Sequence, residues 1–441
     1  MKSGVKVIGG GLAGSEAAYQ LARAGVPVTL YEMRPKVKTF AHKTGRLAEL
    51  VCSNSLKSDS LENASGVLKA EMRKLGSLIM TAADLSKLPA GKALAVDRDL
   101  FSKIVHEKLA ARPGVTIVNE EVTELPDGPC VVATGPLTSP ALSENLRKYL
   151  GADYLYFFDA ISPLIERDSI DLDKVYLGSR YEHGDDYVNC PMTEAEYARF
   201  VSELANAERA ELHNFEEGLL FEGCLPVEEM ARRGADTLRY GPLKPVGLPD
   251  PRTDREPFAA VQLRQENLAN TEVGMVGFQT RLKWGEQKRV FGLIPGLENA
   301  EFTRFGQMHK NLFVNSPILL DKSLRLRRNT DVLLAGQMTG VEGYLESAAM
   351  GLVAGLNLAR IVNGEEPVEF PATTALGALL NYVTTAVANY QPTNVTFGLF
   401  APLDQDIRKK QVRNQALAAR ALAEMDRLIE GLRPAPSGAA K

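Results

Sequence analysis

The sequence VKVIGGGLAGSEAAYQLARAGVPVTLYE occupies residues 5–32 and decides the fold of this chain. Its apolar pattern predicts a strand at 5–8, a helix over about 15–24 and a second strand at 28–31. A helix that connects two neighbouring strands of one sheet makes those strands parallel. The sequence therefore predicts an α/β fold that begins with a Rossmann-type parallel sheet.

The glycines of this unit match the G-x-G-x-x-G pattern of dinucleotide sites. Gly9 permits the tight turn, Gly11 lets the backbone approach a pyrophosphate, and Gly14 lets the helix pack on the strand. The phosphates then face the positive end of the helix. Glu32 ends the second strand, where a carboxylate can bind ribose hydroxyls. The predicted cofactor contacts here are Gly9, Gly10, Gly11, Leu12, Ala13, Gly14 and Glu32.

The segment DVLLAGQMTGVEGYLESAAMG, residues 331–351, repeats the order of strand, glycine turn and helix. A second helix N-terminus on the same sheet suits a large flavin cofactor, because one end of the site holds phosphates and the other the ring. The G-x-G-x-x-G pattern occurs once, so no second nucleotide domain is expected. We expect tightly bound FAD, with NADH or NADPH as a visiting co-substrate. The segment adds the predicted FAD contacts Gly336, Gln337 and Gly340.

The chain has 441 residues, which is longer than a domain with a single hydrophobic core usually is, so more than one domain is expected. From about residue 155 to 300 the pattern changes to short strands, Pro and Gly turns and one helix, which is typical of an inserted α+β domain. The predicted division is an FAD-binding domain at 1–155 and 301–432, an inserted domain at 156–300, and a disordered tail at 433–441.

The composition excludes several classes of protein. A hydrophobic share of 45% and a charged share of 24% are those of a globular chain in water. No run of about 18 apolar residues predicts a membrane span, and the strand at 5–8 leaves no room for a signal peptide. The four cysteines are widely spaced and form no metal-binding pattern with the five histidines. We expect a reduced, cytoplasmic protein without a metal site.

Seven motifs point to one known family. They are, in chain order, GGGLAGSEAA, CSNSLKS, GCLPVEEMARRG, TLRYGPLKPVGL, GFQTRLKWGEQKRVF, IPGLENAEF and GQMTGVEGYLESAAMG. Over about residues 4–420 the sequence resembles the TrmFO family of folate- and FAD-dependent tRNA (uracil-5-)-methyltransferases. The first and last motifs are shared with the larger GidA (MnmG) relatives, which modify the wobble uridine.

The resemblance implies a reaction. The T-loop uridine at position 54, in the T arm of tRNA, would become 5-methyluridine. The one-carbon donor would be 5,10-methylenetetrahydrofolate, FAD reduced by NADH or NADPH would be the reductant, and the methylene would pass through flavin N5 to uracil C5. Such chemistry needs a nucleophile on uracil C6 and a group that removes the C5 proton.

The resemblance also implies roles for two cysteines. Cys224, in GCLPVEEM, would be the nucleophile on C6, since a thiolate adds readily and leaves readily. Cys52, in CSNSLKS, would be the proton acceptor or a partner of the flavin-bound methylene, and the two cysteines could exchange roles. Cys130 lies in an apolar strand and Cys190 in VNCPM, and for both a structural role is expected.

The formal net charge of −4 means that RNA binding requires a local basic patch. The motif GFQTRLKWGEQKRVF offers one, and its Phe278 and Trp284 could stack on an unstacked base. The alternative is an ordinary solvated surface. The predicted tRNA contacts are Arg281, Lys283, Trp284, Lys288 and Arg289.

The folate site is expected where the pterin can stack on the flavin ring, beside the second glycine turn. A buried carboxylate there could accept hydrogen bonds from the pterin, although Glu346 could equally be a first-turn residue favoured by the helix dipole. The predicted folate contacts are Tyr344, Glu346 and His309.

Three alternatives remain open at this point. A GidA-like wobble-uridine modification is disfavoured, because that relative carries a long helical C-terminal extension. A plain NAD(P)H–flavin oxidoreductase is disfavoured, because no paired redox cysteines follow the first βαβ unit. A flavoprotein that binds tRNA without catalysis is compatible with every motif. The sequence does not decide whether the protein is a monomer or a weak dimer.

Overall fold

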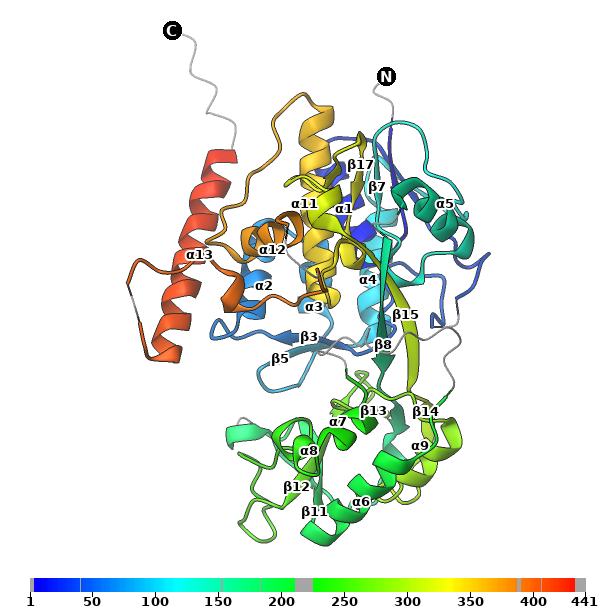
Figure 1. The fold of residues 1–441 in the computed structure, drawn as a ribbon, viewed down its shortest axis with the longest axis vertical. Helices are drawn as coiled ribbons and strands as arrows, with labels where there is room; N and C mark the ends of the chain where they lie inside the picture. Colours follow the sequence, from blue (N-terminus) through cyan, green and yellow to red (C-terminus); the bar gives the residue numbers. More distant parts are fainter. Residues whose placement is uncertain are drawn as a thin grey trace.

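The structure is a computed structural model that describes residues 4–39, 41–151, 154–182, 184–210, 225–386, 390–405 and 407–432. Figure 1 shows two lobes joined by the long strands β8 (Tyr154–Ile161) and β15 (Gln307–Val314). The first lobe contains both ends of the described chain, and the second is built from its middle part. Tyr154 pairs with Val314, so the chain leaves and re-enters the first lobe at neighbouring positions.

The main sheet of the first lobe runs in the order β16-β17-β7-β1-β2-β6. Strands β1, β2, β6, β7 and β17 are parallel, and β16 is an antiparallel edge strand. The strand bounds are β1 (Val5–Ile8), β2 (Val28–Tyr31), β6 (Val115–Val118), β7 (Cys130–Val132), β16 (Arg325–Leu326) and β17 (Asn329–Leu334). The predicted α/β class with a parallel sheet is confirmed.

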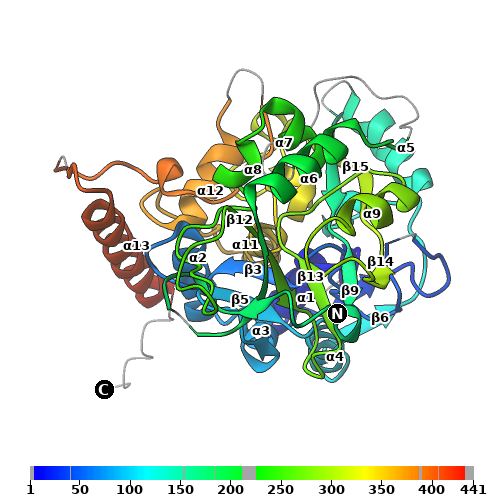
Figure 2. The ribbon, with the colours of Figure 1, turned by 90° about the horizontal axis from the view of Figure 1, so that it is seen from below.

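Helices and a smaller antiparallel sheet surround this main sheet. The smaller sheet has the order β3-β5-β4, with β3 (Ser55–Ser58), β4 (Lys87–Leu88) and β5 (Ala93–Val96). The helices of the lobe are α1 (Leu12–Arg23), α2 (Ala64–Lys74), α3 (Leu78–Leu85), α4 (Arg98–Ala110), α5 (Pro140–Leu150), α10 (Ser316–Leu319), α11 (Tyr344–Val362), α12 (Ala375–Thr384) and α13 (Lys410–Leu432). Helix α13 lies at the outer edge of the lobe against α2 (Figures 1 and 2).

Two glycines let α1 and α11 approach each other closely. A Cβ at Gly351 would collide with the backbone of Ala13, and a Cβ at Gly355 would lie 2.5 Å from the carbonyl oxygen of Ala17. Helix α11 is long and apolar enough to cross a membrane, with a mean hydropathy of 1.3, but 72% of that window is buried in the fold. It therefore belongs to the core of the first lobe.

Two buried glutamates cap helices that lie elsewhere in the sequence. Glu16 on α1 accepts hydrogen bonds from the backbone N–H groups of Leu78 and Ile79, at the start of α3. Glu71 on α2 accepts them from Ala375 and Leu376, at the start of α12. Both side-chain carboxyl groups satisfy N–H groups that the helices themselves leave without acceptors. The caps join α1 to α3 and α2 to α12.

The second lobe contains an antiparallel sheet in the order β10-β11-β12-β13-β9-β14. Its strands are β9 (Leu164–Glu166), β10 (Tyr176–Leu177), β11 (Tyr187–Met192), β12 (Ala259–Gln265), β13 (Glu272–Met275) and β14 (Phe302–Arg304). Its helices are α6 (Glu194–Asn206), α7 (Val227–Arg233), α8 (Thr237–Tyr240) and α9 (Trp284–Phe291). Figure 2 shows these helices gathered over one face of the sheet.

A separate hydrophobic core fills the second lobe, and its buried residues run from Ile165 to Leu297. We propose the lobes as the two domains expected from the sequence. Strand β14 lies beyond the predicted boundary at residue 300 and still pairs with β9 of the second sheet. The predicted tail at 433–441 lies outside the described residues.

Candidate functional site

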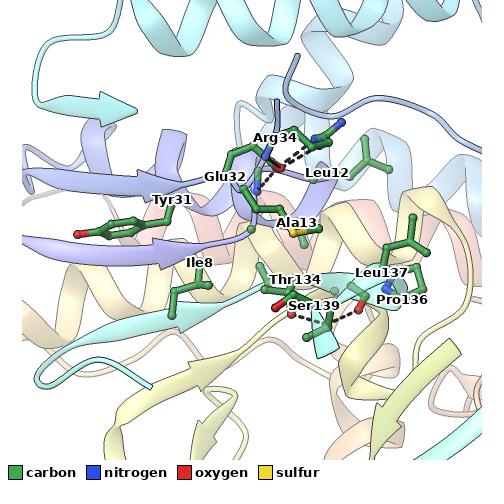
Figure 3. Close-up of a pocket in the computed structure, with 18 of the residues that line it drawn as sticks. Ile8, Leu12, Ala13, Tyr31, Glu32, Arg34, Thr134, Pro136, Leu137 and Ser139 are labelled. Atoms are coloured by element: carbon green, nitrogen blue, oxygen red, sulfur yellow. Dashed lines mark hydrogen bonds and ion pairs between the residues drawn. The ribbon is translucent and has the colours of Figure 1, made fainter. Parts of the chain in front are cut away.

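A deep cleft opens at the carboxyl ends of β1, β2 and β7, where parallel sheets usually bind ligands. It contains about 970 Å³ of space, including the part open to solvent. Of the predicted cofactor contacts, the following line it: Gly9, Gly10, Gly11, Leu12, Ala13, Glu32, Gly336 and Gln337. In Figure 3, Glu32 and Arg34 lie across the cleft from Thr134, Pro136 and Leu137.

The glycine turn leaves room for a ligand at one position and none at its neighbours. A Cβ at Gly9 would lie 2.7 Å from the carbonyl oxygen of Ala133, and a Cβ at Gly14 would collide with the carbonyl of Gly9. Gly10 is packed against Glu32 and Leu47. At Gly11 a Cβ would meet nothing within 4 Å. The space over Gly11, at the N-terminus of α1, therefore fits the pyrophosphate of FAD.

Glu32 is held in place by Arg34. Its Oε1 accepts hydrogen bonds from Arg34 Nε at 2.8 Å and from the Arg34 backbone N–H, and its Oε2 accepts one from the Gly10 N–H at 3.0 Å. Burial opposes ionisation of Glu32, but the bonds and charge of Arg34 outweigh it and hold the pKa below its usual value. Glu32 therefore stays ionised and fixes the glycine turn.

Two further residues, which no sequence pattern marked, line the cleft beside Glu32. Arg34 itself lines the cleft, and so does His42, whose pKa is lowered to about 4 by burial and by the charge of Arg34. His42 is therefore neutral near pH 7. Nothing in the sequence marked His42, because the chain around it carries no periodic pattern.

The segment before α11 also lines the cleft, next to the N-terminus of α1. Gly336, with a φ of +78°, lies against Ala13, and Gln337 donates a hydrogen bond to Glu342 at 2.5 Å. Gly340 has a φ of +79° and faces the ring of Tyr390 instead of the cleft. Of the three residues predicted here, two line the cleft, and the third fixes the turn behind it.

Cys52 lies beside the cleft. Its neighbour Val51 lines the cleft, and the Cys52 backbone N–H donates a hydrogen bond to the Tyr344 hydroxyl at 2.5 Å. Tyr344 also lines the cleft. Burial, followed by the nearby Cys52, raises the pKa of Tyr344, so this hydroxyl stays protonated. The loop CSNSLKS therefore brings a partly exposed thiol next to the predicted flavin site.

The other predicted folate residues are placed differently. Glu346 is fully buried and does not line the cleft; its Oε1 pairs with Lys57 Nζ at 2.5 Å and accepts the Val395 N–H at 3.0 Å. In this structure it is an internal partner of Lys57. His309 lies on β15, but its side chain is outside the described part, and the predicted nucleophile Cys224 also falls outside the described residues.

Carboxylates surround the predicted basic cluster. Arg281 pairs with Glu229, Lys283 Nζ lies 2.7 Å from Glu208, and Arg289 pairs with Glu203 and with Glu286 at 2.8 Å. These pairs reduce the positive field that the sequence alone suggested. The pairs of Lys283 and Arg289 are exposed, and exposed salt bridges contribute little to stability, so a phosphate could compete for these two cations.

Of the two aromatic residues predicted to stack on a base, Phe278 and Trp284, only one is exposed. Phe278 is fully buried in the core of the second lobe, so it cannot stack on a base, and that expectation was wrong. Trp284 is 57% exposed and stacks on Phe305, with ring centroids 5.3 Å apart and planes at 14°. Phe305 stacks in turn on Phe302, and Lys288 Nζ lies 5.7 Å from the Phe305 ring.

Comparison with known proteins places this arrangement in a family. The family model described as Glucose inhibited division protein A matches residues 4–366. Among curated proteins, "Methylenetetrahydrofolate--tRNA-(uracil-5-)-methyltransferase TrmFO" of Bacillus cytotoxicus is 57% identical over 96% of this chain and 98% of its own length. The protein of the same name from Listeria innocua is 56% identical over 98% of this chain and 100% of its own.

Solved structures agree on the fold. The structure of Aquifex aeolicus GidA superposes with a TM-score of 0.69 at 18% identity, over 96% of this chain and 73% of that one. This likeness confirms the fold, and the curated relatives add the family by identity over nearly their whole length. The chain belongs to the TrmFO family, within the wider GidA group.

Proposed function

We propose that this chain transfers a one-carbon unit from 5,10-methylenetetrahydrofolate to C5 of a uracil in tRNA. The family carries this proposal, because relatives named for the reaction match almost the entire chain. The observation in the structure that supports it is the Cys52 loop beside a dinucleotide cleft, joined to that cleft through Tyr344. The cytoplasm, where tRNA and reduced nicotinamide nucleotides occur, remains the predicted location.

The cleft fits FAD. The N-terminus of α1 and the open space over Gly11 would hold the pyrophosphate, and Glu32 would face the ribose. Gly336 and Gln337 line the part of the cleft beside α11, where we place the ring. The chemistry that FAD supplies when bound is the hydride that reduces the donated methylene to methyl. NADH or NADPH would be the source of that hydride.

The two cysteines would act on the uracil. Cys224 Sγ would add to C6, which gives C5 the electron density to attack the donated carbon. The Cys52 thiolate would then accept the proton from C5 as the bond between the donated carbon and its carrier nitrogen breaks. A hydride would reach that carbon to make the methyl group, while the bond between C6 and Cys224 breaks. The role of Cys224 rests on the family motif GCLPVEEM, and the role of Cys52 is also supported by its position beside the cleft.

Tyr344 is the folate contact that the geometry supports best. Its side chain lines the cleft at the N-terminus of α11, where a pterin could stack on a flavin ring, and its hydroxyl is occupied by the Cys52 backbone. The buried position of Glu346 does not support a direct folate contact, and Glu346 is better described as the partner of Lys57.

We place the target uridine at position 54, in the T loop of tRNA. That base is turned inward in the folded tRNA and must leave its stack before C5 and C6 can be reached. The exposed Trp284–Phe305 stack, with Lys288 beside it, offers a surface for such an unstacked nucleotide. The surrounding predicted contacts Arg281, Lys283 and Arg289 would bind phosphates in exchange for their carboxylate partners.

One experiment tests the reaction. The FAD-loaded enzyme would be given a T-stem-loop RNA, NADH or NADPH, and either folate labelled in its methylene carbon or labelled S-adenosylmethionine. Label from the folate should enter 5-methyluridine at position 54. Label from S-adenosylmethionine in the RNA, or folate label at the wobble uridine, would contradict the proposal.

The variant Cys224→Ala tests the nucleophile. It should retain FAD and lose methylation, because no thiolate remains to activate the uracil C5. The matched control is Cys190→Ala, since Cys190 is fully buried in β11 and burial raises the pKa of its thiol. The control should still methylate RNA. Normal turnover by Cys224→Ala would transfer the nucleophile role to another residue.

A further inference from the structure

Two arginines from different lobes meet at Cys52. Arg98, the first residue of α4, donates from Nη2 to the Cys52 carbonyl at 2.7 Å and from Nη1 to the Leu50 carbonyl at 2.8 Å. Arg304, the last residue of β14, donates from Nη2 to the same Cys52 carbonyl at 2.7 Å and from Nη1 to Val51 at 3.0 Å. One backbone carbonyl therefore accepts hydrogen bonds from two guanidinium groups.

A third arginine holds the next part of the loop. Arg264 on β12 donates to Ser53 Oγ and to Asn54 Oδ1, both at 2.8 Å. The Asn54 side chain in turn donates to the Gln265 carbonyl at 2.9 Å. Residues 50–54 are therefore held by hydrogen bonds from both lobes, and the three side chains that donate these bonds are positively charged arginines.

The negative charges around this loop are fewer than the positive ones. Glu266 lies 2.7 Å from Arg98 and 3.7 Å from Arg264, and only 2% of its side chain is exposed. Asp97 uses its carboxylate on the backbone N–H groups of Leu100 and Leu268. Tyr344 is protonated, and Lys57 is neutralised by Glu346.

Among the described residues, three guanidinium groups donate to residues 50–54, and Glu266 is the carboxylate that pairs with two of them. A buried excess of positive charge stabilises any anion that forms nearby, since the low dielectric weakens screening. The Arg304 Nε is also buried and has no hydrogen-bond acceptor among the described residues. Arg98 and Arg304 both lie close enough to Cys52 for their charges to stabilise its side chain when that side chain is ionised.

We propose that Arg304 and Arg98 are positioning residues that keep Cys52 ionised as a thiolate and fix it beside the cofactor cleft. Positive side chains next to a partly exposed cysteine are the usual setting of a reactive thiol. The use made of the thiolate, as acceptor of the uracil C5 proton, rests on the proposed function. The ionisation itself does not, because it needs neither folate nor RNA.

The test measures the ionisation of Cys52 directly. FAD-loaded enzyme without RNA is alkylated with iodoacetamide over a range of pH, and the rate at Cys52 is followed by mass spectrometry of its peptide. We expect the pKa of the Cys52 thiol to lie at least one unit below the ordinary value of about 8.5. At a pH below both pKa values, the thiolate fraction of Cys52 would then be about tenfold larger than that of an ordinary cysteine. A wild-type Cys52 that titrates at or above about 8.5 overturns the proposal.

Variants separate charge from structure. Arg304→Gln removes the charge but keeps an amide that can donate to the Cys52 carbonyl, so the pKa of Cys52 should rise by about one unit. Arg304→Lys keeps the charge and should stay close to wild type. Arg239→Gln is the matched control, because Arg239 also donates to a backbone carbonyl, that of Phe258, in the same lobe. An unchanged pKa in Arg304→Gln would refute the role of Arg304.

Folding and function can be told apart in this design. If Arg304→Gln loses FAD or melts early, Arg98→Gln tests the same charge from the other lobe, and the wild-type titration still decides the question. A low Cys52 pKa together with absent methyltransfer would refute the proposed reaction and leave this inference intact. Methyltransfer together with an ordinary Cys52 pKa would refute this inference and leave the proposed reaction intact.

Discussion

Gly11 separates cofactor binding from folding at the level of a single residue. Its φ is −74°, which any L-residue adopts, and a Cβ there would meet nothing within 4 Å. The variant Gly11→Val should therefore fold, but its side chain would occupy the space of the pyrophosphate. The purified variant should be colourless, because it should no longer retain FAD, and its visible absorbance spectrum checks this.

The control is Gly431→Val, because Gly431 on α13 is exposed and also has open space around it. That variant should remain yellow. A Gly11→Val protein that retains FAD with wild-type absorbance would show that the pyrophosphate does not lie over α1.

Individual site residues differed in how far the sequence revealed them. The glycines at 9–14 and 336–340 were predictable, because each satisfies a local backbone requirement that leaves a mark in the sequence. Arg34, His42 and the arginines around Cys52 were not. Arg304 lies 252 positions from Cys52 and reaches it only through the packing of the lobes, which no local pattern encodes.

The N-terminus of helix α12 is capped by a carboxyl group from another helix. Glu71 caps its first N–H groups at 2.7 and 2.9 Å, and burial raises the pKa of Glu71 to about 8, against the opposing effect of those two bonds. The folded state therefore keeps this proton up to about pH 8, whereas the unfolded chain loses it near pH 4.5. The resulting stabilisation is complete below the unfolded value and is lost as the pH rises through this window.

We expect the thermal unfolding midpoint of the holoenzyme to decrease as the pH rises from 5 to 8. Glu71 should lower the free energy of unfolding by about 1.4 kcal/mol per pH unit in this range. Glu71→Gln cannot titrate, so its midpoint should depend less steeply on pH. The control Glu124→Gln, at an exposed site, should keep the wild-type slope. Equal slopes for Glu71→Gln and wild type would show that Glu71 is ionised throughout.

Elements with a strong internal period were predicted well, and elements fixed from outside were not. The strands β1, β2 and β17 and the helix α11 follow from apolar runs and glycine turns. Residues 35–65 carry no clear period in the sequence, yet they contain β3, whose Lys57 has a φ of +65°. Helix α3 is capped locally by Ser77, whose side chain accepts the Met80 N–H, and also by Glu16, 62 positions before Leu78; only the second cap is invisible to a local pattern.

Under the proposed function, RNA would meet both lobes. Trp284, Phe305 and Phe302 form a continuous stack on the second lobe, while the cleft and Cys52 belong to the first. A nucleotide held by Trp284 would keep the RNA against both lobes. Trp284→Ala should weaken binding of a T-stem-loop by about 1–3 kcal/mol, measured by fluorescence anisotropy with FAD bound.

Two comparisons make this test specific. Tyr240→Ala removes another exposed aromatic ring from the second lobe, and it should leave affinity close to wild type. Lys288→Gln should lower the slope of affinity against salt by about one counterion, because it removes one phosphate contact. If Trp284→Ala binds RNA as tightly as wild type, the aromatic stack serves only the packing of its own lobe.

The paired strands β8 and β15 also bear on how such a molecule can change over generations. Because Ile161 pairs with Gln307, residues 162–306 begin and end at adjacent backbone positions. A segment with neighbouring ends can be inserted, removed or exchanged as a cassette, since the remaining chain closes over a short gap. Descendants of one ancestral flavoprotein could thus have acquired different middle segments, and with them different substrates, while inheriting the same flavin cleft.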